Sequence, residues 1–181
     1  MRSVLVIRDY EPRDEQGWLR CRVLAFLETA YHDDVKQAKE HYHNPALELV
    51  AELEGQIVGL LDVEYDLEPA QVCTAYETRR GGMIWHITTH PDHKRRGVGA
   101  ALLGEAVRRS RALGLEYLEA WTRDDPWVRG WYERSGFSPG NSYWHVYVEG
   151  QDGLSSEVPG LRPAYTFAHY TGSEIEAIRG R

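Results

Sequence analysis

A basic segment with two glycines lies near the middle of this 181-residue chain, between an apolar stretch and a stretch with helical periodicity. Its residues are Lys94, Arg95, Arg96, Gly97, Val98, Gly99 and Ala100. The first amides of a helix have no partner within the helix, and its N-terminus carries partial positive charge, so an anion is stabilised there. Glycines let that anion approach the backbone closely. The segment therefore predicts a strand, a phosphate-binding turn and a helix.

Two common phosphate-binding motifs do not fit this segment. A Walker A loop requires Gly-Lys followed by Ser or Thr, but here Gly99 is followed by Ala100. A dinucleotide-binding fingerprint requires a third glycine at position 102, where the chain has Leu102. Its glycines also follow the strand directly and not after a basic loop. Residue types therefore exclude both motifs.

The segment instead resembles the acetyl-coenzyme A signature of the GNAT family of N-acetyltransferases. That signature is Arg or Gln, two residues, Gly, one residue, then Gly or Ala. This chain has Lys94 at the first position and Gly97 and Gly99 at the two glycine positions. The resemblance implies that backbone amides of about residues 95–100 hold the pyrophosphate.

A second family feature follows about thirty residues later. The family has an aromatic pair shortly before Gly-Phe, and Trp131-Tyr132 before Gly136-Phe137 is similar to it. The family often has an Asn seven residues before the Tyr, in contact with the pantetheine arm, and this chain has Asp125 there. An Asp accepts hydrogen bonds but cannot donate them as Asn does.

The resemblance implies a reaction and its binding residues. Two parallel strands, residues 84–89 and 117–121, are expected to splay apart and admit the pantetheine arm of acetyl-CoA, the cosubstrate. The amine then attacks the thioester directly in a ternary complex. The residues expected to contact the cosubstrate are Ile87, Thr88, Thr89, Lys94, Arg95, Arg96, Gly97, Val98, Gly99, Ala100, Asp125 and Tyr132.

Two residues are predicted to be catalytic. Tyr132 matches the family tyrosine and is expected to be the general acid that protonates the leaving thiolate. His86 lies on the strand before the basic segment, and an imidazole suits proton transfer near neutral pH, so it is the predicted general base. Glu64, Asp62 and a chain of water molecules are alternatives for the base. Backbone amides around residues 88–89 are expected to stabilise the oxyanion.

Periodicity and turn residues predict the elements that position these groups. Predicted helices cover residues 14–30, 34–41, 97–112 and 126–135, and predicted strands cover 4–8, 47–53, 56–66, 84–89, 115–121, 143–149 and 161–170. With the resemblance, they indicate a single-domain α/β GNAT fold whose mixed central sheet has splayed parallel strands and flanking helices. Residues 1–150 are expected to form the acetyltransferase domain, and residues 151–181 an extension packed on it.

One predicted strand carries acidic side chains on a single face. Asp62, Glu64, Asp66 and Glu68 alternate with Leu61, Val63, Tyr65 and Leu67. Alternate residues of a strand point to opposite faces. The favoured interpretation is a solvated outer face, and the alternative is a groove that attracts amines.

The composition of the chain limits the classes of partner that it is expected to bind. A formal charge of −7 and a pI near 5.6 argue against nucleic-acid binding, which needs a basic face. No metal is expected: two cysteines form no CxxC pair, and no regular spacing unites the His41 and His43 pair with other ligands.

No signal peptide or membrane span is predicted, so we expect a cytoplasmic protein, monomeric or homodimeric. The acceptor is expected to be a small-molecule or peptide amine, and a non-catalytic acyl-CoA-binding regulatory domain is the alternative function.

Overall fold

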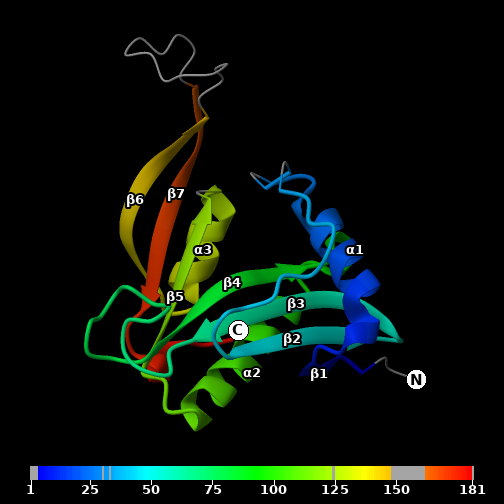
Figure 1. Cartoon of the computed structure of the whole chain (residues 1–181). Coiled ribbons are helices and arrows are strands. Elements are labelled where there is room, and N and C mark those ends of the chain that lie inside the picture. The colour runs from blue at the N-terminus through cyan, green and yellow to red at the C-terminus, as the bar shows by residue number, and fades with distance from the viewer. Residues whose placement is uncertain (1–3, 30, 33, 124, 148–161, 181) are drawn as a thin grey trace.

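The computed structural model describes residues 4–29, 31–32, 34–123, 125–147 and 162–180. Seven strands form one sheet in the order β1-β2-β3-β4-β5-β7-β6 (Figure 1). The strands are β1 Val6–Asp9, β2 Ala46–Leu53, β3 Gln56–Tyr65, β4 Gly81–Thr89, β5 Tyr117–Arg123, β6 Ser138–Tyr147 and β7 Arg162–Gly172. The helices are α1 Glu15–Phe26, α2 Val98–Ala112 and α3 Pro126–Arg134, with 3-10 turns at Pro12–Asp14, Pro91–His93 and Ile175–Ala177. The predicted mixed α/β sheet with flanking helices is confirmed.

The two parallel strands in the middle of the sheet diverge. β4 pairs with β5 only from Gly81 to Ile84, opposite Tyr117 to Ala120, although both strands continue. Just beyond this point β4 has a bulge against β3, since Val63 faces Ile84 and Asp62 faces His86, with Trp85 between them. A bulge bends its strand and increases its twist. Figure 1 shows β5, β6 and β7 rising away from β4, so the predicted splay is present.

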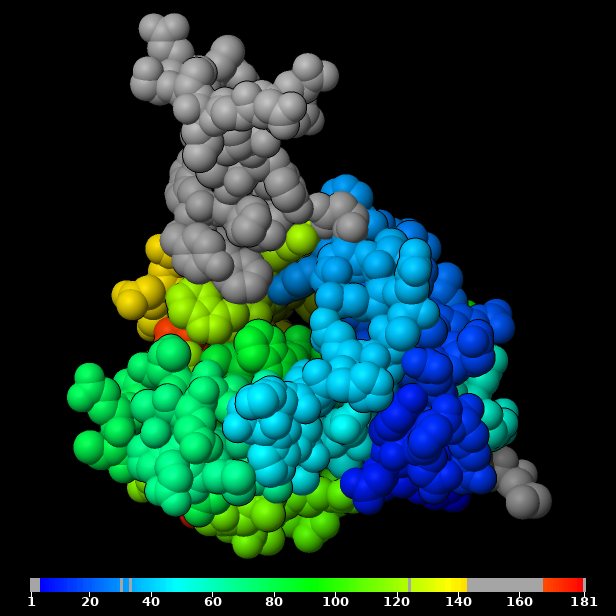
Figure 2. Space-filling view, in the orientation of Figure 1, coloured from blue at the N-terminus to red at the C-terminus, as the bar shows by residue number. Residues whose placement is uncertain are grey.

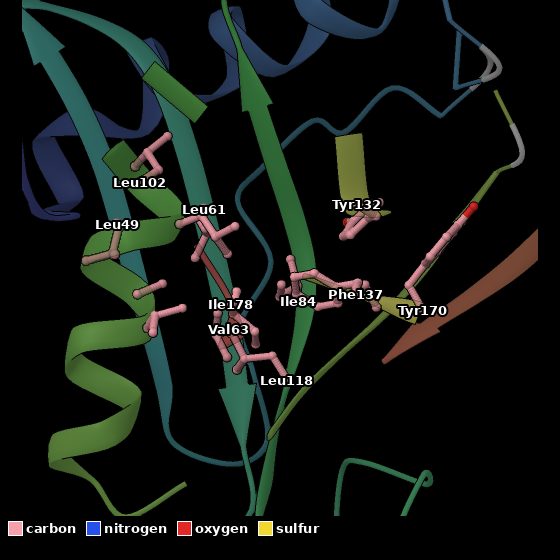
Figure 3. Close-up of a cluster of buried hydrophobic side chains, with 14 of the residues drawn as sticks. Leu49, Leu61, Val63, Ile84, Leu102, Leu118, Tyr132, Phe137, Tyr170 and Ile178 are labelled. Atoms are coloured by element: carbon pink, nitrogen blue, oxygen red, sulfur yellow. The ribbon is translucent and has the colours of Figure 1, made fainter. Parts of the chain in front are cut away.

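Neighbouring residues of β3 pack on opposite faces of the sheet. Leu61 belongs to the large core beneath α2, which also contains Leu49, Val63, Ile84, Leu102 and Leu118 (Figure 3). Leu60 packs instead with Trp18 of α1. The sheet is therefore covered by α1 on one face and by α2 on the other. No helix in the described part of the chain is long and apolar enough to cross a bilayer.

Two predictions about the elements are wrong. Residues 34–41 do not form a helix, because side chains of this segment bond to the sheet and not along a helix. Of the four acidic side chains predicted to share a solvated outer face on β3 and just after it, Glu68 is exposed, but Asp62 and Asp66 are 0% exposed and Glu64 is 7% exposed. Each of these three buried carboxylates accepts hydrogen bonds from a neighbouring loop. The ends of two predicted strands, residues 148–149 and 161, lie outside the described residues.

Candidate functional site

The predicted phosphate turn begins α2. Gly97 has φ 81° and ψ 4°, the left-handed region that glycine adopts without strain, and no atom lies within 4 Å of where its Cβ would stand. Residues 94–97 are exposed and include three cationic side chains. The amides of Val98, Gly99 and Ala100 occupy the first helical turn and have no partner within the helix. The turn therefore presents amides and positive charge to one open site.

The start of α2 lies beside both β4 and α3. A Cβ on Gly99 would stand 3.6 Å from Thr89 Oγ1 at the end of β4 and 3.9 Å from the Trp131 ring of α3. From Trp85 onward, β4 is paired only with β3 within the described residues. Backbone groups that face the diverging β5, among Ile87, Thr88 and Thr89, thus line the path from the turn into the splay.

Tyr132 lies in the core beneath the splay. Its ring stacks on Tyr170 at 4.9 Å between centroids and makes an edge contact with Phe137 at 5.2 Å (Figure 3). It makes a similar edge contact with Trp131 at 5.1 Å. Burial, and next the nearby Tyr31, raise the pKa of Tyr132. Its hydroxyl therefore keeps its proton at neutral pH, as a general acid must before it donates.

Tyr31 lies near Tyr132, and the sequence did not predict that it belongs to this part of the molecule. It follows α1 and reaches the end of β5, where its hydroxyl donates to Thr122 Oγ1 at 3.2 Å and accepts the amide hydrogen of Arg123 at 3.0 Å. Its ring stacks on Phe26 at 5.0 Å. No sequence signal identifies this contact, because 91 residues separate Tyr31 from Thr122. The segment after α1 therefore reaches the end of β5, on the other side of the gap between β4 and β5.

His86 lies on the face covered by α1, in contact with that same segment. Its Nε2 forms a hydrogen bond with Glu40 Oε2, and its ring meets the edge of Trp18 at 5.4 Å. This hydrogen bond is the largest cause that lowers the pKa of Glu40 to about 2. Glu40 was not found from the sequence, because it lies 46 residues from His86 in a segment predicted to be helical.

The two carboxylates proposed as alternative bases both accept hydrogen bonds, although one oxygen of Asp62, Oδ1, has no hydrogen-bond partner among the described residues. Asp62 accepts from Lys39 Nζ at 3.0 Å and from the Tyr42 hydroxyl at 2.8 Å. Glu64 accepts from Trp85 Nε1 at 2.8 Å and from the backbone and side-chain nitrogens of Asn44. Burial alone would raise the pKa of Glu64, but these bonds hold it below its ordinary value. Which of His86, Asp62 and Glu64 acts as the base stays a prediction.

A second carboxylate–histidine pair lies across the splay. His169 of β7 contacts Glu119 of β5 at 2.9 Å, and its ring stacks on Trp121 at 4.6 Å. Burial opposes ionisation of Glu119, but the bonds from His169 and from the 74–75 backbone lower its pKa to about 2. The sequence alone gave no indication of this pair, because β5 and β7 are far apart in the chain.

The surface is hollowed where three segments of the chain meet. Figure 2 shows the hollow where the light-blue segment between α1 and β2, the green β4 and the yellow-green start of α3 meet. Trp85, the bulged residue of β4, is 46% exposed.

Asp125 precedes α3, and its carbonyl accepts from the amides of Val128 and Arg129. A role for its side chain in binding pantetheine stays a prediction. Among the described residues, no three His, Cys, Asp or Glu side chains gather as metal ligands.

Comparison with known proteins identifies the family. The sequence model of the Acetyltransferase (GNAT) family matches residues 7–137, which include the glycine turn, the splayed strands and Tyr132. The chain belongs to the GNAT acetyltransferase family. An acetyltransferase of Pectobacterium atrosepticum is 30% identical over 118 residues, 65% of this GNAT chain and 73% of that protein. An acetyltransferase of Yersinia pestis is 33% identical over 93 residues, 51% of this chain and 57% of that protein.

Solved structures of acetyltransferases share the fold. The ribosomal-protein-S18-alanine N-acetyltransferase of Escherichia coli aligns with a TM-score of 0.63 at 15% identity, over 93% of this chain and 92% of that chain. A GNAT-family structure from Desulfovibrio desulfuricans aligns with a TM-score of 0.65 at 21% identity, over 95% and 99%. At these identities the similarity establishes the fold of this GNAT protein but not its acceptor.

Proposed function

We propose that this GNAT protein transfers an acetyl group from acetyl-CoA to an amine by direct attack in a ternary complex. The observation that best supports the proposal is the separation of β4 from β5 beside the glycine turn. A thioester arm that enters there lies between His86 on one side of the splay and Tyr132 on the other. Cationic residues 94–96 complement the phosphates, and the amides of residues 97–100 suit the pyrophosphate.

The chemistry divides between two side chains. The neutral amine attacks the thioester carbonyl, so a C–N bond forms and the C–S bond breaks. His86 takes the proton that the amine loses, and Tyr132 gives a proton to the departing thiolate. Backbone amides of β4 near residues 88–89 stabilise the negative oxygen of the intermediate. Solvent then returns the proton to Tyr132 and removes one from His86.

Release of free thiol tests the proposal. Acetyl-CoA is mixed with a panel of small amines and of peptides with free N-termini, and each acetylated product is confirmed by mass. We expect turnover with at least one acceptor. Tyr132→Phe should bind acetyl-CoA normally but turn over ~10²- to 10⁴-fold more slowly, the usual worth of general acid catalysis.

The same experiment distinguishes the alternative. Binding of acetyl-CoA without thiol release across the whole panel would favour a regulatory acyl-CoA-binding domain. Near wild-type turnover by a folded Tyr132→Phe protein would remove Tyr132 as the acid while leaving acetyl transfer intact. Peptides belong in the panel because the Escherichia coli structural neighbour is named for a ribosomal-protein alanine acceptor.

A further inference from the structure

The segment between α1 and β2 is anchored by a buried lysine. Lys39 is only 4% exposed although residues 34–45 form no helix or strand. Its ammonium contacts Asp62 and Glu48. Three aromatic rings also surround it at 5.0–5.2 Å, those of Tyr10, Trp18 and Tyr42. Opposite charge and aromatic faces both stabilise a cation, so Lys39 fixes this part of the segment against the sheet.

The next residue carries the carboxylate that contacts His86. Glu40 Oε1 accepts from Lys36 Nζ at 2.6 Å, and Glu40 Oε2 is bonded to His86 Nε2. An ionised carboxylate can only accept hydrogen bonds, so Nε2 of His86 carries the hydrogen. In a neutral imidazole the lone pair that takes a proton is then on Nδ1.

We propose that Glu40 is a positioning residue for His86: it selects the Nε2–H tautomer and the ring orientation that leave Nδ1 to accept the proton of the attacking amine. This inference rests on the proposed function, because His86 acts as a base only if acetyl transfer takes place. The amine N–H bond breaks, its proton moves to Nδ1, and its electron pair stays on the nitrogen that is forming the amide. Glu40 also stabilises the imidazolium that results.

The charges around His86 set the direction of a pH effect. Glu40 contacts the ring and Asp62 lies near it. Lys36 pairs with Glu40 and Asp34, and Lys39 pairs with Asp62 and Glu48. Removing the charge of Glu40 takes away the carboxylate that contacts the ring, and with it a direct stabilisation of the imidazolium. The acidic limb of the pH–rate profile should therefore move to lower pH.

Nitrogen NMR tests the tautomer without any turnover. The apo protein is labelled with ¹⁵N-histidine at pH 8, and the His86 signals are assigned by their loss in His86→Gln. We expect wild-type His86 to be the Nε2–H tautomer alone. Glu40→Ala should give a mixture of both tautomers, whereas Glu40→Gln retains an acceptor oxygen and should keep most of the Nε2–H form.

Kinetics with an accepted amine provide the second measurement. Glu40→Ala should lower kcat by about 10- to 100-fold, less than the ~10²- to 10⁴-fold that loss of a general base costs. KM for acetyl-CoA should not change, and Glu40→Gln should lie between Glu40→Ala and wild type. The control is Glu52→Ala, which removes a carboxylate of similar exposure that pairs with Arg8 instead and should behave as wild type.

The outcomes separate this inference from the proposed function. A single Nε2–H tautomer in Glu40→Ala, or wild-type kcat and pH profile in that variant, would overturn the positioning role while acetyl transfer stands. Absence of turnover in wild type with every amine would overturn the proposed function, and the NMR result would then report the Glu40–His86 contact alone. Mixed tautomers together with a lower kcat in Glu40→Ala support the inference.

Discussion

The Lys39–Asp62 ion pair shows how much a single buried charge depends on its partner. Their side chains are 3% and 0% exposed. Burial opposes the charge of Lys39, but Asp62 and Glu48 more than offset it and raise its pKa. Lys39→Met leaves Asp62 buried without its main counter-charge. We expect this change to lower the free energy of unfolding by about 3–5 kcal/mol in urea denaturation.

The double variant Lys39→Met with Asp62→Asn is the control for that prediction. The amide that replaces the carboxylate is uncharged and can still accept from Tyr42, so the double variant should recover most of the lost stability. Equal destabilisation in the single and double variants would show that packing of Lys39, and not its charge, holds the segment.

Residue types gave candidates for the site but not the groups that contact them. Tyr132 and Gly97 became candidates because each belongs to a short pattern along the chain. His86 became a candidate as a lone histidine on a strand, but its contact with Glu40 was not predicted, because that contact depends on how a segment without regular structure folds over the sheet. For the same reason the alternation of Asp62 and Glu64 predicted a shared face correctly and its burial wrongly.

At the scale of elements, the first turn of α2 gives a prediction that separates folding from binding. Gly97→Ala places a Cβ in a left-handed residue, which should cost about 1–2 kcal/mol although the surrounding space is open. Because this turn sets the direction of the first helical amides, acetyl-CoA should bind at least about tenfold more weakly, a loss of about 1.4 kcal/mol. Calorimetric titration measures the affinity.

Gly99→Ala is the matched control for Gly97→Ala. Gly99 lies within α2, and its added Cβ would meet only ordinary contacts at 3.6 and 3.9 Å. Stability should change by less than about 1 kcal/mol, since alanine favours a helix. Equal loss of affinity in both variants would mean that the ligand needs the space at Gly99 and does not depend on the conformation of Gly97.

Elements with strong periodicity were predicted well and the others poorly. The β2–β3 hairpin and α2 follow from alternation and from helical spacing. The segment 34–41 has polar residues and a closing proline that suit a helix, but tertiary bonds to Asp62 and His86 override that preference. The splay of β4 from β5 came from family resemblance alone, because periodicity along a strand does not reveal where its pairing stops.

At the scale of the whole molecule, the last described residues complete the core. β7 lies between β5 and β6, and the chain after it brings Ile175 and Ile178 into the main cluster. A Cβ on Gly180 would come within 1.9 Å of the Ala100 carbonyl oxygen of α2. β7 comes last in the sequence but pairs between β5 and β6, and such a long-range contact is not predicted by any local sequence pattern. The division at residue 150 stays a prediction.

This architecture suggests that the ligand should stabilise the molecule as a whole. Only four residues of β4 pair with β5 in the described chain, and the proposed acetyl-CoA site bridges α2, β4 and α3 across that junction. A ligand at 100 times its dissociation constant adds about 2.7 kcal/mol, or about 5–10 °C in Tm for a chain of this length. Differential scanning fluorimetry should show this rise with acetyl-CoA but not with equal ATP. An equal rise with ATP would mean that the turn binds phosphates generally and that the splay contributes no affinity for the thioester arm.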